Sequence, residues 1–150
     1  MAKRWSKRLK CRKHKRRKNK RLKRKRIKRV NRVRIDTHHI FFMRKTWNRL
    51  GYRKLRTFPY CMVPLERDTL HRYIHSNMYD IPTPEPFAVE EALKQLRMLD
   101  SAGVLLNDDP IEKRITLLAA LFDCSAQPTA DALRKQLELV YRFKNEQPSE

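Results

Sequence analysis

The sequence predicts an α+β protein: a small strand–strand–helix unit, a helical segment after it, and a disordered basic arm before it. Two patterns lead to this fold class. Short stretches in the first half alternate apolar and polar residues, which is typical of strands, whereas the second half repeats apolar residues at helical intervals. The predicted boundaries are 1–31 for the arm, 32–79 for the ββα unit and 87–145 for a three-helix C-terminal segment.

The arm is distinguished by its charge. Residues 1–34 hold 21 of the 37 Lys and Arg residues and no Asp or Glu, so the remaining chain, with 16 of each sign, is formally neutral. Such an arm buries too little apolar surface to offset its ordering entropy, and we expect it to be disordered. Its natural partner is DNA or RNA, because each phosphate that it neutralises releases condensed counterions. The predicted nucleic-acid contacts are Arg12, Lys13, Arg16, Arg17, Arg21, Arg24, Arg26, Arg29, Arg32, Arg34, Arg44, Arg53, Lys54 and Arg56.

Cysteine usage and hydropathy limit the compartment. Cys11, Cys61 and Cys124 are odd in number and far apart, which argues against a disulfide framework and against a cysteine zinc site. No run approaches the roughly 20 apolar residues of a membrane span, and the N-terminus lacks the apolar core of a secretory signal. We therefore expect a cytoplasmic protein, associated with the nucleoid or a ribonucleoprotein, that has no membrane partner.

The ββα unit is predicted from three stretches. Residues 32–42 alternate and end in an apolar run, which indicates a strand that stops near a histidine pair, and residues 60–65 resemble a second short strand. The intervening stretch 44–56 fits either a short helix or a long loop. A helix is expected from residue 66 or 67 to 78, because Leu70, Ile74 and Met78 share one face.

The C-terminal segment follows a stiff linker, residues 80–86, in which three prolines prevent helix formation. A first helix over 87–102 should end at Gly103 in a left-handed conformation. Asp109-Pro110-Ile111-Glu112 has the pattern of a capping box that starts a second helix, and a third runs from about 129 to 143. Three short amphipathic helices need a surface to cover, which is each other, the ββα unit or a protein partner.

Four of the five histidines fall in two clusters: His38-His39, where the first strand ends, and His71 and His75 on the expected helix. Side chains four apart on a helix share a face, so His71 and His75 can bind one ion. If the helix packs on the strands, three histidines converge on a divalent metal ion and one stays unligated. Three neutral ligands leave positions for water and a phosphate oxygen, and a free imidazole can take a proton from water.

This arrangement resembles the HNH or His-Me finger (ββα-metal) nucleases, and the colicin-type DNase domains in particular. Those domains show a similar His-His…His-x-x-Ile-His layout, and the stretch from His71 to His75 matches its last part. Asp36 lies where such domains often carry an acidic residue. The resemblance implies a metal-dependent endonuclease in which His38, His71 and His75 bind Mg²⁺, Mn²⁺, Ni²⁺ or Zn²⁺ and His39 is the catalytic general base.

The resemblance covers residues 32–78 and departs from the family in one place. The family's middle Asn, which orients the general base, lies at the end of the second strand nearest the turn, before the helix; here that stretch reads Tyr60-Cys61-Met62-Val63. Asn48 and Asn77 lie elsewhere. Two other classes of function therefore stay open: a non-catalytic DNA- or RNA-binding accessory or ribonucleoprotein component with a degenerate HNH-like fold, and a structural protein of ribosomal type.

Individual residues also have simpler interpretations. Paired histidines in a basic protein can be phosphate contacts, and an HxxxH helix can carry one core and one exposed histidine. Trp47, Tyr52 and Tyr60 lie among basic residues and can stack on bases. We expect Trp47 to be a core residue instead, and Cys61 to be a small buried hydrophobe.

Overall fold

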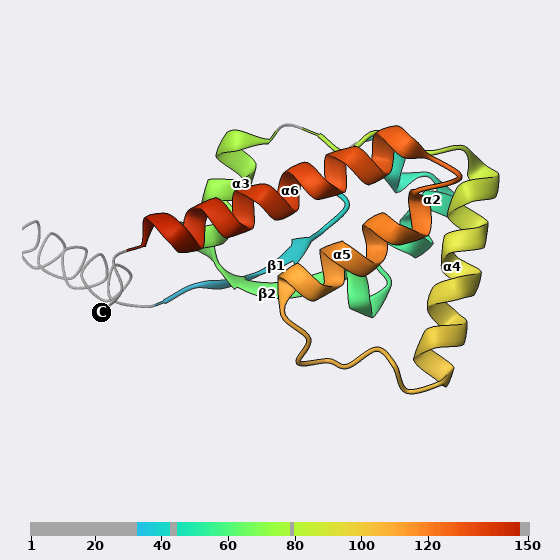
Figure 1. The fold of residues 1–150 in the computed structure, drawn as a ribbon, viewed down its shortest axis with the longest axis horizontal. Coiled ribbons are helices and arrows are strands. Elements are labelled where there is room, and N and C mark those ends of the chain that lie inside the picture. Colours follow the sequence, from blue (N-terminus) through green and yellow to red (C-terminus); the bar gives the residue numbers. More distant parts are fainter. Residues whose placement is uncertain (1–32, 43–44, 79, 148–150) are drawn as a thin grey trace, which may run out of the picture. The chain divides into compact units, whose positions relative to one another are not determined.

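The computed structural model describes residues 33–42, 45–78 and 80–147, and Figure 1 shows their arrangement. Residues 34–150 form one compact unit, separate from residues 1–33. The predicted disorder of the arm lies outside the described residues. The same is true of ten predicted nucleic-acid contacts: Arg12, Lys13, Arg16, Arg17, Arg21, Arg24, Arg26, Arg29, Arg32 and Arg44.

The two predicted strands form an antiparallel pair. Strand β1 covers Ile35–His39 and strand β2 covers Met62–Glu66. In this register His38 lies opposite Val63 and His39 lies opposite Met62. Because successive side chains of a strand point to opposite faces, the two histidines point away from each other. His38 is buried, whereas His39 is only partly buried.

The stretch between the strands is helical. A 3₁₀ turn over Thr46–Asn48 leads into helix α2 (Leu50–Arg56), and a second 3₁₀ turn over Pro59–Cys61 enters β2. Trp47 is fully buried and Cys61 is buried too, as expected. Tyr60 is 4% exposed and also belongs to the core. Because neither ring is accessible, the alternative in which Trp47 and Tyr60 stack on nucleic-acid bases is wrong.

The helix predicted from residue 66 or 67 to 78 is present but not continuous. A π-helical turn over Arg67–His71 precedes helix α3 (Arg72–Asn77), with a kink at Thr69 (φ −115°, ψ −115°). The Thr69 hydroxyl donates to the Glu66 carbonyl at 3.1 Å, a local bond of the kind that competes with helical hydrogen bonding. Of the predicted apolar face, Leu70 and Ile74 are buried and Met78 packs against the core.

The three predicted C-terminal helices are α4 (Pro86–Ser101), α5 (Ile111–Phe122) and α6 (Gln127–Glu146). Gly103 is left-handed, with φ of 72°, as predicted. The capping box is wrong: the N-cap of α5 is Pro110 and no side chain caps it. The Asp109 carboxylate instead accepts hydrogen bonds from the Tyr60 hydroxyl (2.8 Å), the Leu106 amide and Lys113. Among the described residues, no helix combines the length and apolar character needed to cross a membrane.

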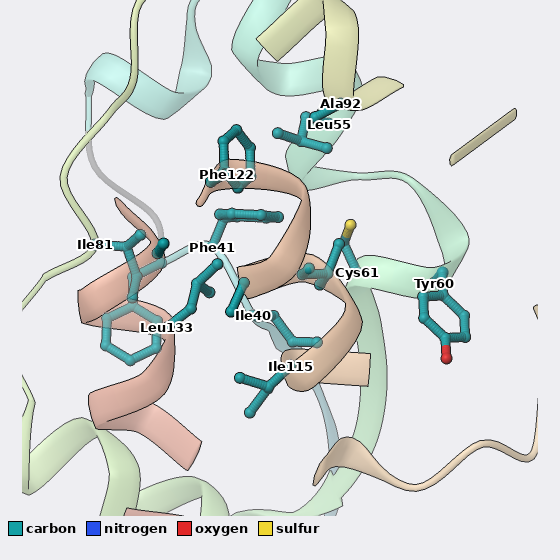
Figure 2. Close-up of a cluster of buried hydrophobic side chains, with 14 of the residues drawn as sticks. Ile40, Phe41, Leu55, Tyr60, Cys61, Ile81, Ala92, Ile115, Phe122 and Leu133 are labelled. Atoms are coloured by element: carbon teal, nitrogen blue, oxygen red, sulfur yellow. The ribbon is translucent and has the colours of Figure 1, made fainter. Parts of the chain in front are cut away.

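One hydrophobic core joins the two predicted segments. Helices α5 and α6 pack side by side, α3 packs against α6, and α4 packs against α2 and α5 (Figure 1). Figure 2 shows Ile40 and Phe41, which follow β1, among side chains of the C-terminal helices. The Phe41 ring lies 4.8 Å from Trp47 and 6.0 Å from Phe122, centroid to centroid.

The proline-rich linker has neither helix nor strand over residues 80–85, as predicted. Three side chains from other elements hold its carbonyl groups. Trp47 Nε1 donates to Ile81 (2.9 Å), the Tyr52 hydroxyl to Pro84 (2.7 Å) and the Thr129 hydroxyl to Pro82 (2.8 Å). The linker is thus tied to the segment before α2, to α2 itself and to α6.

Candidate metal centre

His38, His71 and His75 converge. One ring nitrogen of each lies within 4.8 Å of the others. The ring centroids are 5.3 Å apart for His38 and His71, 5.5 Å for His38 and His75, and 4.6 Å for His71 and His75. Nitrogens bound to one zinc ion lie roughly 3.3 Å apart, because the bonds are about 2.0–2.1 Å long, so adjustments of about 1 Å close the cluster onto an ion.

The backbone explains the convergence. Side-chain alternation along β1 turns His38 toward the interior. His71 is the last residue of the π-helical turn and His75 lies one turn further, in α3. The kink at Thr69 separates the start of this turn from His71 and from α3. The cluster runs from a buried His38 through a half-buried His71 to an exposed His75, so solvent reaches it from the His75 side.

His38 has the environment of a metal ligand. Its side chain is fully buried and its Nε2 lies 2.9 Å from Oε1 of Gln136. The other ring nitrogen, Nδ1, is buried and has no hydrogen-bond partner among the described residues. A buried polar atom without a partner is costly unless it serves a ligand. The nitrogen set of the three histidines therefore fits a divalent ion with an affinity for imidazole.

Burial also keeps His38 and His75 unprotonated. Burial lowers the pKa of His38 to about 4, an effect opposed by the Gln136 hydrogen bond and reinforced by His75 and His71. His75 is exposed by area, but its ring lies against Phe42 (4.7 Å between centroids). This partial desolvation, followed by the charge of His71, lowers the pKa of His75. At neutral pH both rings therefore offer a lone pair to a metal ion.

His39 lies outside this cluster of three. Partial burial lowers its pKa, with smaller electrostatic contributions from Arg56 and His71. The ring is therefore neutral at pH 7 and can accept a proton. Both Arg56 and His71 thus act electrostatically on the His39 ring.

Arg56 differs from the other described basic residues that were predicted to contact nucleic acid. Arg34, Arg53 and Lys54 are exposed, whereas Arg56 is 6% exposed and its Nε is buried without a hydrogen-bond partner. Burial, and then the charge of Arg53, lowers the pKa of Arg56. The Nε–H group of this guanidinium is therefore an unused donor among the described residues.

Sequence reasoning missed two residues of the site, Gln136 and Phe42. Both depend on contacts that no local pattern encodes: Gln136 is 98 residues from His38, and the Phe42 ring packs on both His75 and His38. An inward-facing glutamine on an otherwise apolar helix face is the one signal that was available.

Asp36, the acidic residue that the resemblance singled out, forms an ion pair with Arg67 (3.4 Å).

No asparagine occupies the place of the family's middle Asn. Met62 lies opposite His39 in the strand register, and the Asn77 amide donates to the Tyr73 carbonyl of its own helix. Comparison with known proteins found no family model, no curated protein and no solved structure that matches the chain. The chemistry of the site is therefore argued from its own residues.

Proposed function

We propose that the protein is a metal-dependent phosphodiesterase that cleaves DNA or RNA, with β1, β2 and α3 as a ββα-metal unit of HNH type. One observation carries the proposal: three imidazole nitrogens lie within 4.8 Å of one another, and Nδ1 of His38 is buried without a partner. Three neutral ligands that leave coordination positions open are the arrangement of a catalytic site rather than of a closed structural site.

The ligand set narrows the choice of metal. Imidazole nitrogens suit Zn²⁺ and Ni²⁺, whereas Mg²⁺ and Mn²⁺ prefer carboxylate and water oxygens. The cluster consists of histidines alone. Of the four candidate ions we therefore favour Zn²⁺ and Ni²⁺.

The residues divide the reaction between them. A bound divalent ion supplies Lewis-acid stabilisation of the charge that develops on the phosphate and the leaving oxygen. His38, His71 and His75 hold it. His39 accepts the proton of a water molecule whose oxygen attacks phosphorus, and the bond from phosphorus to the leaving oxygen breaks. Arg56, which acts electrostatically on His39 and has an unpartnered Nε among the described residues, donates a hydrogen bond to the phosphate.

The charge distribution supports a polyanionic substrate. Arg53 and Lys54 are exposed on α2, the helix that carries Arg56. The 21 basic residues of positions 1–34 add a long cationic segment next in the chain to β1. Phosphate contacts of this kind give affinity without sequence preference.

The test is cleavage of supercoiled plasmid and of single-stranded RNA with Mg²⁺, Mn²⁺, Ni²⁺ or Zn²⁺, each with and without chelator. We expect Zn²⁺ or Ni²⁺ to support cleavage. His39→Ala should lower the rate about 10²–10⁴-fold, the usual contribution of a general base, with metal content unchanged. The double variant His71→Ala/His75→Ala should lose both metal and activity, and His14→Ala, in the arm, should lose neither. Cleavage by His39→Ala at the wild-type rate would contradict the mechanism.

A second candidate is a nucleic-acid-binding protein with a non-catalytic metal centre. Met62 favours it, because a thioether opposite His39 cannot orient the imidazole as an amide does. Metal binding and nucleic-acid binding without cleavage, in wild type and His39→Ala alike, would identify this second function.

A further inference from the structure

Gln136 joins the C-terminal helix α6 to the histidine cluster. Its side chain is fully buried. Its amide oxygen lies 2.9 Å from Nε2 of His38, and its amide nitrogen donates to the Ile40 carbonyl at 3.0 Å. Both ends of the amide are therefore engaged, and both partners belong to β1 or to the residue that follows it.

The Ile40 carbonyl determines which way the amide points. A backbone carbonyl can only accept a hydrogen bond, so the NH₂ group of Gln136 must face it. The oxygen of Gln136 then faces His38, and because this oxygen also only accepts, Nε2 of His38 must carry the proton. A neutral imidazole has one N–H, so Nδ1 holds the lone pair.

The opposite tautomer has no support in this environment. With the proton on Nδ1, the lone pair of Nε2 would face the lone pairs of Gln136 Oε1. The Nδ1–H group would also be buried with no acceptor among the described residues. Both effects favour the tautomer that offers Nδ1 to a metal ion.

We propose that Gln136 is the positioning residue of the metal centre: it selects Nδ1 of His38 as the ligating atom and holds the ring. The inference rests on the proposed metal site and extends it to a helix that the ββα unit does not include. Residues that hydrogen-bond to the second nitrogen of a metal-bound histidine commonly change metal affinity about 10–100-fold.

Two variants separate the two hydrogen bonds. Gln136→Met keeps an unbranched side chain of similar size and removes both bonds. Gln136→Glu keeps an oxygen that accepts from Nε2 of His38. We expect Zn²⁺ and Ni²⁺ affinity to fall about 10–100-fold in Gln136→Met and to be largely restored in Gln136→Glu. Gln95→Met is the matched control, because among the described residues the Gln95 side chain bonds to Glu91 of its own helix alone.

The experiment has two readouts on the full-length chain. The first is the tautomer of His38 in the metal-free wild type at neutral pH, from the ¹⁵N chemical shifts of its ring; the second is titration of each variant with Zn²⁺ and Ni²⁺. A protonated Nε2 and weaker binding by Gln136→Met support the inference. A wild-type ring protonated on Nδ1, or unchanged affinity in a folded Gln136→Met, overturns it.

The first readout keeps the inference distinct from the proposed function. If the wild type binds neither ion, the metal centre fails, and the role of Gln136 as its positioning residue fails with it, even where Nε2 carries the proton. If the wild type binds metal and cleaves nucleic acid while Nδ1 carries the proton, the function stands and the role of Gln136 is overturned. If Gln136→Met does not fold, the tautomer of the wild type decides.

Discussion

His38 combines full burial with a titratable ring, and this makes the metal-free protein sensitive to acid. Its pKa is lowered to about 4 in the folded protein, from 6.5. Between these two pH values His38 is protonated in the unfolded chain and neutral in the folded protein. The stability that depends on a neutral His38 is fully present above pH 6.5 and is lost as the pH falls toward 4.

This predicts that the free energy of unfolding of the chelator-treated protein falls by up to about 3 kcal/mol between pH 7 and pH 4 on account of His38. Urea unfolding at pH 7, 5.5 and 4.5 measures it. His38→Asn should show a correspondingly smaller decline over the same range. An equal decline in both proteins would assign the acid sensitivity to other groups.

The environments of some individual residues could be predicted from the sequence, and those of others could not. Trp47 and Cys61 are buried as their neighbours indicated, and three of the four clustered histidines meet. Asp109 was predicted to cap a helix because its pattern is local, but its carboxylate bonds to Tyr60, 49 residues away. Gln136 shows the same limit, since hydrogen bonds between distant elements leave no periodic trace in the chain.

At the scale of elements, Arg114 fastens helix α5 to the strand pair. Its guanidinium donates to the carbonyls of Asp109 (2.8 Å), Asn107 (2.6 Å) and Met62 (3.2 Å), and it lies over the Tyr60 ring at 5.1 Å. The side chain is 4% exposed. Three carbonyls from two segments thus depend on one buried cation.

Replacement of Arg114 by Met should therefore lower the free energy of unfolding by about 2–4 kcal/mol, because buried carbonyls lose their donors. Urea unfolding at pH 7 measures the loss. Arg97→Met, on the exposed face of α4, is the control and should change stability by less than about 0.5 kcal/mol. A loss of that size or less for Arg114→Met would show that water replaces the guanidinium.

The elements themselves were largely predictable. Alternation identified β1, and apolar spacing identified α4, α5 and α6, because each of these patterns reports one buried face. The kink at Thr69 was not predictable, since Leu70 and Ile74 keep their helical spacing across it. The stretch that forms α2 was left open between a short helix and a long loop, because Gly51 disfavours helix locally, whereas the burial of Leu55 in the core favours it.

At the scale of the whole molecule, metal binding and folding should be linked. An ion that binds only the folded protein stabilises it by about 2.7 kcal/mol at a free concentration 100 times its Kd. Thermal unfolding with and without Zn²⁺ or Ni²⁺ measures this as a rise in Tm that chelator reverses. His71→Ala/His75→Ala should show no rise. A rise that persists in the double variant would place the ion elsewhere.

The arm gives a separate prediction. Residues 34–150 form a compact unit of their own, so deletion of residues 1–31 should leave the helical circular dichroism of the rest unchanged. Nucleic-acid affinity should depend less on salt, because each lost phosphate contact reduces the slope of log K against log salt by about 0.9 on duplex DNA. Binding to labelled DNA and RNA at several salt concentrations measures this. An unchanged slope would place the contacts outside the arm.

The linker over residues 80–85 has a consequence for how this protein can be divided. Trp47, Tyr52 and Thr129 donate hydrogen bonds to its carbonyl groups. The linker is therefore fixed against the elements on both sides of it and does not act as a hinge. A fragment that stops before the linker keeps the histidines but loses Gln136 and also Phe122, whose ring packs edge-on against Phe41. The ββα unit of this chain is therefore not a transplantable module: a chimera that receives it must receive the C-terminal helices too.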